Sequence, residues 1–90
     1  IALESNHSGQ WDVYTVPAAG GPLKRLTETP GIDAFPSYSR DGRFLYFMSE
    51  RTGRREVWKM PAEGGKAEQI TFDGGAVAFE SPDAKYLYYT

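Results

Sequence analysis

Residues that could perform nucleophilic or acid–base chemistry are few in this sequence, and they are not arranged for it. The only histidine is His7, and no Ser/Asp set accompanies it. A Gly-x-Ser-x-Gly elbow, which would present a nucleophilic serine at a strand-to-helix turn, does not occur. In the internal repeat described below, the residue equivalent to His7 is Arg51, so we interpret His7 as an ordinary loop residue. We expect no catalytic residue in this chain and classify it as not an enzyme.

Carboxylates at comparable places in the chain raise the question of a metal site. Asp33, Asp73 and Glu80 could converge near the start of a strand, but a cation site needs several oxygen ligands. Aspartates beside turns more often accept hydrogen bonds from turn amides. A buried Glu80 would need a partner, for which Arg43 or Lys85 are candidates. We therefore predict structural roles, no metal and no cofactor.

A small basic cluster is formed by Arg51, Arg54 and Arg55. It could bind an acidic partner, but Glu50 and Glu56 flank it. Exposed charges of opposite sign at this spacing neutralise one another at little net gain in stability. We expect local ion pairs.

The two tryptophans have different surroundings. Trp58 lies within an expected strand and should pack between neighbouring sheets, whereas Trp11 stands at the end of a polar loop and should be partly exposed. Trp11 is therefore the aromatic residue we would test as a contact to a partner.

Composition excludes several classes of protein. The 90 residues carry a net charge of −2, which favours neither nucleic acid nor an anionic membrane as partner. Disulfides and thiolate metal sites are excluded because there is no cysteine, and no apolar run approaches the length of a membrane span. Aromatic residues make up 14%, and ten glycines and six prolines punctuate the chain throughout, which favours short strands.

An internal repeat organises these strands. Residues 5–27 match residues 49–71 at an offset of 44 with eight identities, and residues 39–47 match 81–89 at an offset of 42. Four strands per period are expected, at 34–39, 44–49, 56–60 and 67–71, which we call a to d. Gly42 in the a–b turn is free to take a positive φ, and Gly64-Gly65 suit a primed c–d hairpin turn. Four antiparallel strands in about 42–44 residues is the period of a β-propeller blade.

The central strands should be buried on both faces. Residues 44–48 and 86–89 show no polar alternation, as expected for a sheet held between two neighbouring blades. Strands c and d are more mixed, so burial should fall from the centre of a blade towards its outer edge.

The segment 35–47, Phe-Pro-Ser-Tyr-Ser-Arg-Asp-Gly-Arg-Phe-Leu-Tyr-Phe, resembles the WD40-like (PD40) repeat of TolB-like β-propellers. The resemblance covers essentially the whole chain. Arg40 stands where that family usually has proline, and Ala84 where it usually has glycine. The second turn is therefore expected to be strained or of another type.

The strand order predicts one complete blade and two partial ones. Residues 1–27 would supply strands b, c and d of a first blade, 34–71 a whole second blade, and 76–90 strands a and b of a third. Two blades' worth of strands cannot close a ring, and the open ends would leave aromatic surface in water. We expect the chain to be a piece of a longer propeller, or to need copies of itself, and not to be a stable monomer alone.

Strand alternation places the b–c and d–a loops on one rim of the blades. These longer loops are where propellers usually bind partners. Any binding role is therefore assigned to this rim, with these residues as possible contacts: Trp11, Asp33, Arg51, Arg54, Arg55 and Asp73.

The resemblance implies two competing functions. TolB-like propellers are non-catalytic scaffolds that bind proteins or ligands in the bacterial envelope, which slightly favours a periplasmic location; similar repeats also form the sensory part of some winged-helix regulators. The alternative is the propeller cap of a prolyl-oligopeptidase-like peptidase, whose catalytic residues lie in another domain. Expected partners are other blades and possibly another protein, with no nucleic acid and no membrane insertion.

Overall fold

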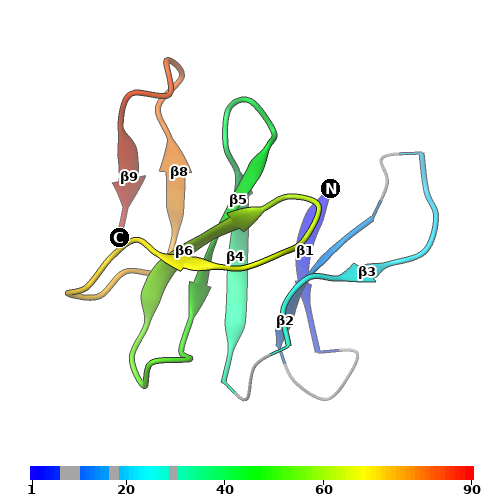
Figure 1. Ribbon diagram of the computed structural model, residues 1–90, viewed down its shortest axis with the longest axis horizontal. Coiled ribbons are helices and arrows are strands. Elements are labelled where there is room, and N and C mark those ends of the chain that lie inside the picture. Colours follow the sequence, from blue (N-terminus) through cyan, green and yellow to red (C-terminus); the bar gives the residue numbers. More distant parts are fainter. Residues whose placement is uncertain (7–10, 17–18, 29–30) are drawn as a thin grey trace.

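A computed structural model describes residues 1–6, 11–16, 19–28 and 31–90, which hold strands and turns and no helix. The strands of these residues form three antiparallel sheets, with the orders β1-β2-β3, β4-β5-β6-β7 and β8-β9 (Figure 1). Their bounds are β1 Ala2–Ser5, β2 Asp12–Thr15, β3 Lys24–Arg25, β4 Asp33–Tyr38, β5 Phe44–Ser49, β6 Glu56–Pro61, β7 Glu68–Gln69, β8 Ala78–Glu80 and β9 Leu87–Tyr89. The all-β prediction is confirmed, although β3 and β7 are only two residues long.

The three sheets pack against one another through alternate side chains. Between the first and second sheets, Val13 of β2 meets Leu45 and Phe47 of β5 in one buried cluster. Between the second and third sheets, Val57 and Tyr46 meet Ala78 of β8 in another. The two valines are repeat equivalents, so both junctions are built from the same position of the blade.

Burial is highest in β5, as the unbroken apolar sequence predicts. Its residues from Leu45 to Ser49 are all buried, because a sheet covers each of its faces. Strand β9, expected to be buried on both faces in a complete blade, is exposed here. Tyr88 and Tyr89 are more than half exposed, because none of the described strands covers that end, as expected for an open partial blade.

The two a–b turns have the same pattern of hydrogen bonds. Ser39 Oγ donates to Asp41 Oδ1 (2.7 Å) and Ser81 Oγ donates to Asp83 Oδ1 (2.6 Å), and each turn closes through the amide three residues after the serine. Gly42 has a φ of 73°, and Ala84 takes 62° in the same place. The second turn is therefore of the same type and places alanine in the left-handed region, where a Cβ is unfavourable.

The c–d turn differs from the predicted primed hairpin. Its hydrogen bond runs from Gly64 N to Pro61 O (3.0 Å), so Ala62 and Glu63 occupy the centre, and neither has a positive φ. Gly64 (109°) and Gly65 (136°) follow the turn and redirect the chain into β7.

A bulge in β4 is held by the preceding sheet. The pairing of β4 with β5 shifts between Ala34 and Ser37, and Phe35 at the shift has a φ of 53°. Glu4 Oε1 on β1 accepts a hydrogen bond from Phe35 N (3.0 Å). A side chain of the first sheet thus satisfies an amide that the bulge removes from the ladder.

Candidate functional site

The connections β1–β2, β3–β4, β5–β6 and β7–β8, where described, form what we call the loop rim. Figure 1 shows the β3–β4 and β5–β6 connections at the lower end of the view, opposite the β4–β5 and β8–β9 turns. The connections of the loop rim are the b–c and d–a connections of the repeat, as strand alternation predicts.

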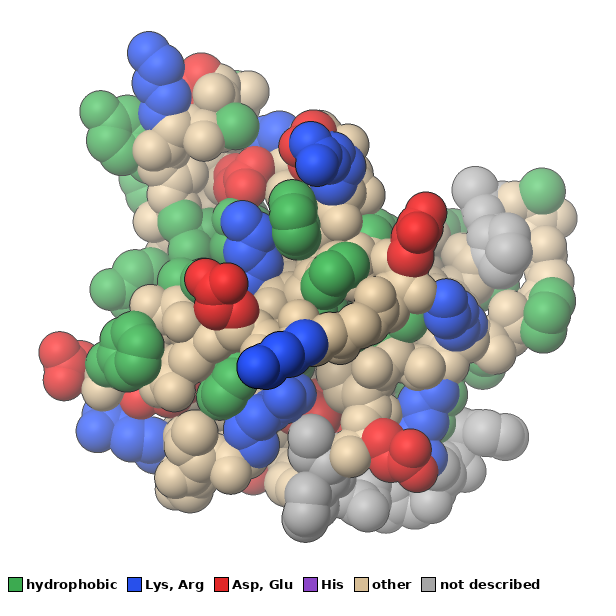
Figure 2. Space-filling model, viewed as in Figure 1, with side chains coloured by type: hydrophobic (Ala, Val, Ile, Leu, Met, Phe, Trp, Pro, Cys, Tyr) green, Lys and Arg blue, Asp and Glu red, His purple; other side chains and the backbone are tan. Residues whose placement is uncertain are grey.

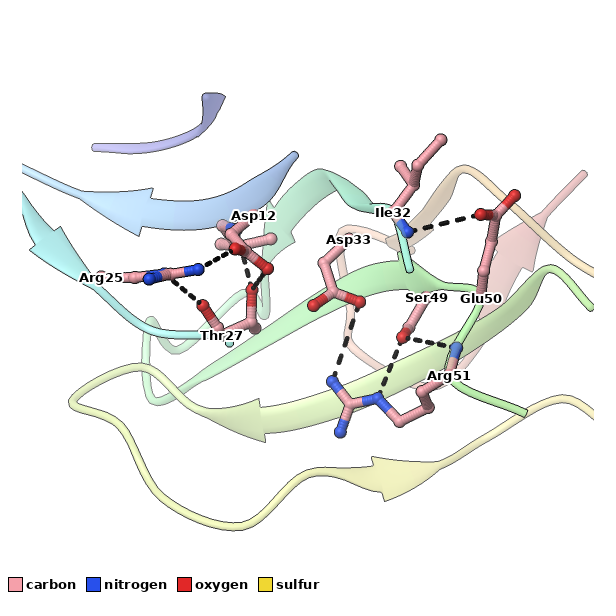
Figure 3. A network of polar contacts seen from close by, with 9 residues as sticks. Asp12, Arg25, Thr27, Ile32, Asp33, Ser49, Glu50 and Arg51 are labelled. Atoms are coloured by element: carbon pink, nitrogen blue, oxygen red, sulfur yellow. Dashed lines mark hydrogen bonds and ion pairs between the residues drawn. The ribbon is translucent and has the colours of Figure 1, made fainter. Parts of the chain in front are cut away.

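A layer of buried polar side chains lies just inside the loop rim. Its first part is in the first sheet. Asp12 is fully buried at the start of β2, and its Oδ1 accepts a hydrogen bond from Thr27 Oγ1 (3.1 Å) (Figure 3). The same hydroxyl accepts from Val13 N (2.9 Å), and Arg25 pairs with Asp12 Oδ2 (2.5 Å). The carboxylate is therefore hydrogen-bonded on both oxygens, which is what its burial requires.

The second sheet repeats this arrangement. Glu56 is 1% exposed at the start of β6, and its Oε1 accepts from Thr71 Oγ1 (2.7 Å) and from Gly74 N (2.9 Å). Thr71 Oγ1 in turn accepts from Val57 N (2.8 Å). Sequence reasoning missed this pairing, although its signal was present. An acidic residue fifteen positions before an identical threonine recurs in both repeats, as Asp12 with Thr27 and as Glu56 with Thr71.

The third acidic residue of the layer lies under an arginine. Asp33 is fully buried at the start of β4, and Arg51 approaches its Oδ1 at 3.9 Å (Figure 3). Arg51 Nε also donates to Ser49 Oγ (2.9 Å), and its guanidinium lies 4.5 Å from the centre of the Trp58 ring. Asp33 is buried too deeply to touch a partner, and Arg51 is held on three sides.

The exposed members of the loop rim sit on this layer. Trp11 is 42% exposed, and the side chains of Arg54 and Arg55 are 59% and 63% exposed. Arg54 pairs with Glu56 (3.2 Å) and Arg55 with Glu50 (3.6 Å), so the predicted local neutralisation of the basic cluster is confirmed.

Two main-chain hydrogen bonds fix the rim where one sheet passes to the next. Asp33 N donates to Trp11 O (2.8 Å), and Gly75 N donates to Arg55 O (3.0 Å). Trp11 and Arg55 are repeat equivalents, so the same tie occurs at both junctions. Asp73 lies exposed in the connection between β7 and β8.

Glu80 lies away from the loop rim, and its predicted partners Arg43 and Lys85 are wrong. Its Oε1 accepts from Arg40 N (2.8 Å), and its Oε2 accepts from Tyr46 OH (2.7 Å). The hydrogen bonds from the Arg40 amide and the Tyr46 hydroxyl lower the pKa of Glu80. The pKa of Tyr46 is raised, first by burial and then by this carboxylate. The contact was not predictable from one repeat because it joins two sheets.

Among the described residues, no group of three or more histidine, cysteine or carboxylate side chains could hold a metal ion. His7 lies outside the described residues. No helix in the described ranges is long and apolar enough to cross a membrane. Open hollows of about 430 and 470 Å³ lie at the opposite end from the loop rim, beside Pro61–Gly64.

Comparison with known families decides what this arrangement belongs to. The family model described as the TolB β-propeller domain, PD40, matches residues 1–90. The chain belongs to this family. Membership accounts for the repeat, the a–b turn motif and the antiparallel sheets, and the predicted resemblance is confirmed.

Curated relatives and solved structures agree with the family. The chain is 44% identical over 41 residues to the Tol-Pal system protein TolB of Bordetella pertussis, and 37% identical over 51 residues to a TolB homolog of Chlorobium chlorochromatii. These matches cover 44% and 57% of the chain, but only 9% and 12% of the relatives.

Among solved structures, a TolB-type protein of Agrobacterium tumefaciens superposes over 99% of the chain, with a TM-score of 0.92 and 30% identity. TolB of Acinetobacter baumannii superposes over 98% with a TM-score of 0.85 and shares the fold at 23% identity. The chain spans 33% and 23% of those two proteins. It therefore corresponds to a part of a larger TolB-like propeller.

Proposed function

We propose that this chain is part of a non-catalytic propeller scaffold that binds another protein through the loop rim. The observation that carries this proposal is the exposure of Trp11, Arg54 and Arg55 above a buried polar layer, in which Asp12 and Glu56 each accept a hydrogen bond from a buried threonine. Tryptophan and arginine supply much of the binding energy at protein interfaces. A rigid support lowers the entropy cost of ordering them on binding.

Each predicted contact residue has a place in this proposal. Trp11 and Asp73 are exposed and would touch the partner directly. Arg54 and Arg55 would exchange their present glutamate partners for acceptors on the bound protein. Buried Asp33 and the clamped Arg51 would hold the rim in place from below.

The blade assignment is part of the same proposal. Residues 1–27, 34–71 and 76–90 would be the last three strands of one blade, a complete blade, and the first two strands of the next. The sheets of three, four and two strands support this division. The partial blades would be completed by the rest of a longer chain or by copies.

The partner and location follow from the relatives. The Bordetella relative is named Tol-Pal system protein TolB, and the Chlorobium relative is named a TolB homolog. We therefore infer that the partner is another protein of a Tol-Pal system and that the chain works in the bacterial envelope, in the periplasm. These relatives give no support to a peptidase cap.

The test is a titration of the chain with each purified protein of a Tol-Pal system. For the protein that binds, we expect Trp11→Ala to weaken the affinity about tenfold to a hundredfold, as loss of a central aromatic contact does. Arg55→Ala should weaken it less, and the loss should shrink as salt is added, because its charge is exposed.

The matched control is Leu23→Ala. Leu23 is 47% exposed, much like Trp11, but lies in the β2–β3 connection at the opposite rim. Its removal should leave the affinity unchanged. If Leu23→Ala weakens binding as much as Trp11→Ala, or if Trp11→Ala and Arg55→Ala both bind like the wild type, the loop rim is not the interface.

A further inference from the structure

The β8–β9 sheet carries an exposed aromatic face. Phe79, Tyr86 and Tyr88 are 52%, 65% and 53% exposed, and the rings of Phe79 and Tyr88 contact each other at a tilt of 42°, with their centres 5.9 Å apart. Figure 2 shows hydrophobic side chains gathered at the left edge of the molecule, where Figure 1 places β8 and β9. Three large exposed aromatics on one sheet face mark a surface that something covers.

The chain itself shows what covers this face, because the preceding sheet has the same face in covered form. Tyr46 is the repeat equivalent of Tyr88 and is only 6% exposed. Ala78 and Leu87 of the next sheet pack on it. In turn, Leu87 and Ala78 lie on the opposite side of β8–β9 from Tyr88, as strand alternation requires.

The covered junction contains a polar contact that depends on one unusual residue. One carboxylate oxygen of Glu80, on β8, accepts a hydrogen bond from Arg40 N, and the other accepts one from Tyr46 OH. Arg40 Nε also reaches Glu80 O (3.3 Å) and Ser81 O (3.2 Å). Arg40 thus supplies an amide and a side chain to the following sheet.

The exposed junction lacks that donor. The repeat equivalent of Arg40 is Pro82, which has no backbone N–H. A carboxylate arriving beside Pro82 would receive at most the Tyr88 hydroxyl, which leaves an ionised group with one strong donor. Burying a charge so poorly bonded is costly, whereas a neutral side chain pays no such penalty. A neutral side chain occurs at this position in the repeat, since strand β4 carries Tyr38 where β8 carries Glu80.

We propose that the face of Phe79, Tyr86 and Tyr88 docks the first two strands of another blade of the same repeat, bearing a neutral side chain in place of Glu80. The residue at Arg40 or Pro82 in one blade would thereby select which blade follows it. This face is separate from the loop rim, so either proposal can fail without the other.

The test extends the chain with its own repeat. Thr90 is equivalent to Met48, so residues 1–90 followed directly by a second copy of 49–90 continue the strand order without a linker. The appended segment places a second β8–β9 unit against Tyr88. Nitration of tyrosines by tetranitromethane, located by mass spectrometry, should be at least tenfold slower at Tyr86 and Tyr88 in the extended chain than in residues 1–90.

The selection is tested by the appended copy of Glu80. Changing that copy to Gln or Tyr should raise the folding equilibrium constant at least fivefold in urea unfolding, whereas the original Glu80→Gln should lower it at least fivefold. With Pro82→Arg the gain from the appended Gln should vanish or reverse. The matching change, Arg40→Pro, should remove the loss caused by the original Glu80→Gln.

Specific results would overturn the proposal. If nitration of Tyr86 and Tyr88 is unchanged by the extension, a blade of this repeat does not dock there. If the 90-residue chain alone shows concentration-dependent protection of Tyr88, a second copy is the occupant. If Glu, Gln and Tyr in the appended copy give equal stability regardless of Pro82→Arg, the face docks a blade but position 82 does not select it.

Discussion

Replacement of Thr71 by valine tests the buried polar layer most directly. The two side chains have nearly the same volume, so packing at this 5% exposed position is largely kept. What is lost is one hydroxyl with two roles. It accepts from Val57 N (2.8 Å) and donates to Glu56 Oε1 (2.7 Å), and all three groups are buried.

The expected cost follows from what each partner retains. Val57 N has no other acceptor in this contact and would be left unsatisfied, at about 1–3 kcal/mol. Glu56 keeps Gly74 N on the same oxygen and Arg54 on the other, so its loss is smaller, about 1 kcal/mol. We therefore expect Thr71→Val to lower the free energy of unfolding by about 2–4 kcal/mol.

The assay is urea unfolding followed by tryptophan fluorescence at one fixed protein concentration, since association would otherwise change the apparent stability. Thr71→Ser keeps the hydroxyl and should lose less than half as much. Thr52→Val changes an exposed threonine of the β5–β6 loop and should stay within about 0.5 kcal/mol of the wild type. A Thr71→Val chain as stable as Thr52→Val would refute the idea that this hydroxyl holds the rim.

Three further predictions concern the turns, the acid response and the arginines. Ala84→Gly should stabilise the chain by about 0.5–1 kcal/mol, because glycine adopts the positive φ of this position without strain. Gly42→Ala should destabilise it by about 1 kcal/mol through backbone strain alone, because the new Cβ would meet nothing within 4 Å. Thermal melts of both variants check these values. Folding lowers the pKa of Glu80 below its usual value of about 4.5, so its ionised carboxylate stabilises the fold above that pH, and this stabilisation is lost as the pH falls through the lowered pKa. Glu80→Gln should therefore flatten the pH dependence of the urea midpoint below pH 5. Arg51→Ala should lower the free energy of unfolding by about 1–2 kcal/mol, because Arg51 contacts Ser49 and the Trp58 ring. Arg55→Ala removes an exposed ion pair and should change the free energy of unfolding, measured by urea titration, by less than about 0.5 kcal/mol.

The fold was largely readable from the sequence because the repeat places equal residues at equal structural positions. Val13 and Val57, or Ser39 and Ser81, can be aligned from the sequence alone, and the members of each pair have similar surroundings in the structure. Features without a clear repeat equivalent were harder to predict. The c–d glycines indicated a primed turn, but glycine pairs also follow a turn to redirect the chain, and composition does not separate the two.

The candidate site was readable only in part. The sequence indicated which loops share a rim and that Arg54 and Arg55 would be neutralised nearby. It did not place Asp33 in the interior, because an aspartate beside a turn is usually exposed. It also assigned Glu80 to nearby cations, whereas the real donors lie forty and thirty-four residues earlier on another sheet. Contacts across sheets depend on packing that one strand's sequence does not contain.

The main-chain ties at the loop rim bear on how such a surface can change over evolutionary time. In these ties Trp11 and Arg55 take part through their carbonyls, and Asp33 and Gly75 through their amides. Any residue has a carbonyl, and any residue except proline has the amide, so the tie places almost no demand on side-chain identity. Random substitution at positions 11 and 55 should therefore be tolerated for folding and be selected only by what binds. A ring joined in this way can acquire new partners by point mutation while its blades stay in register.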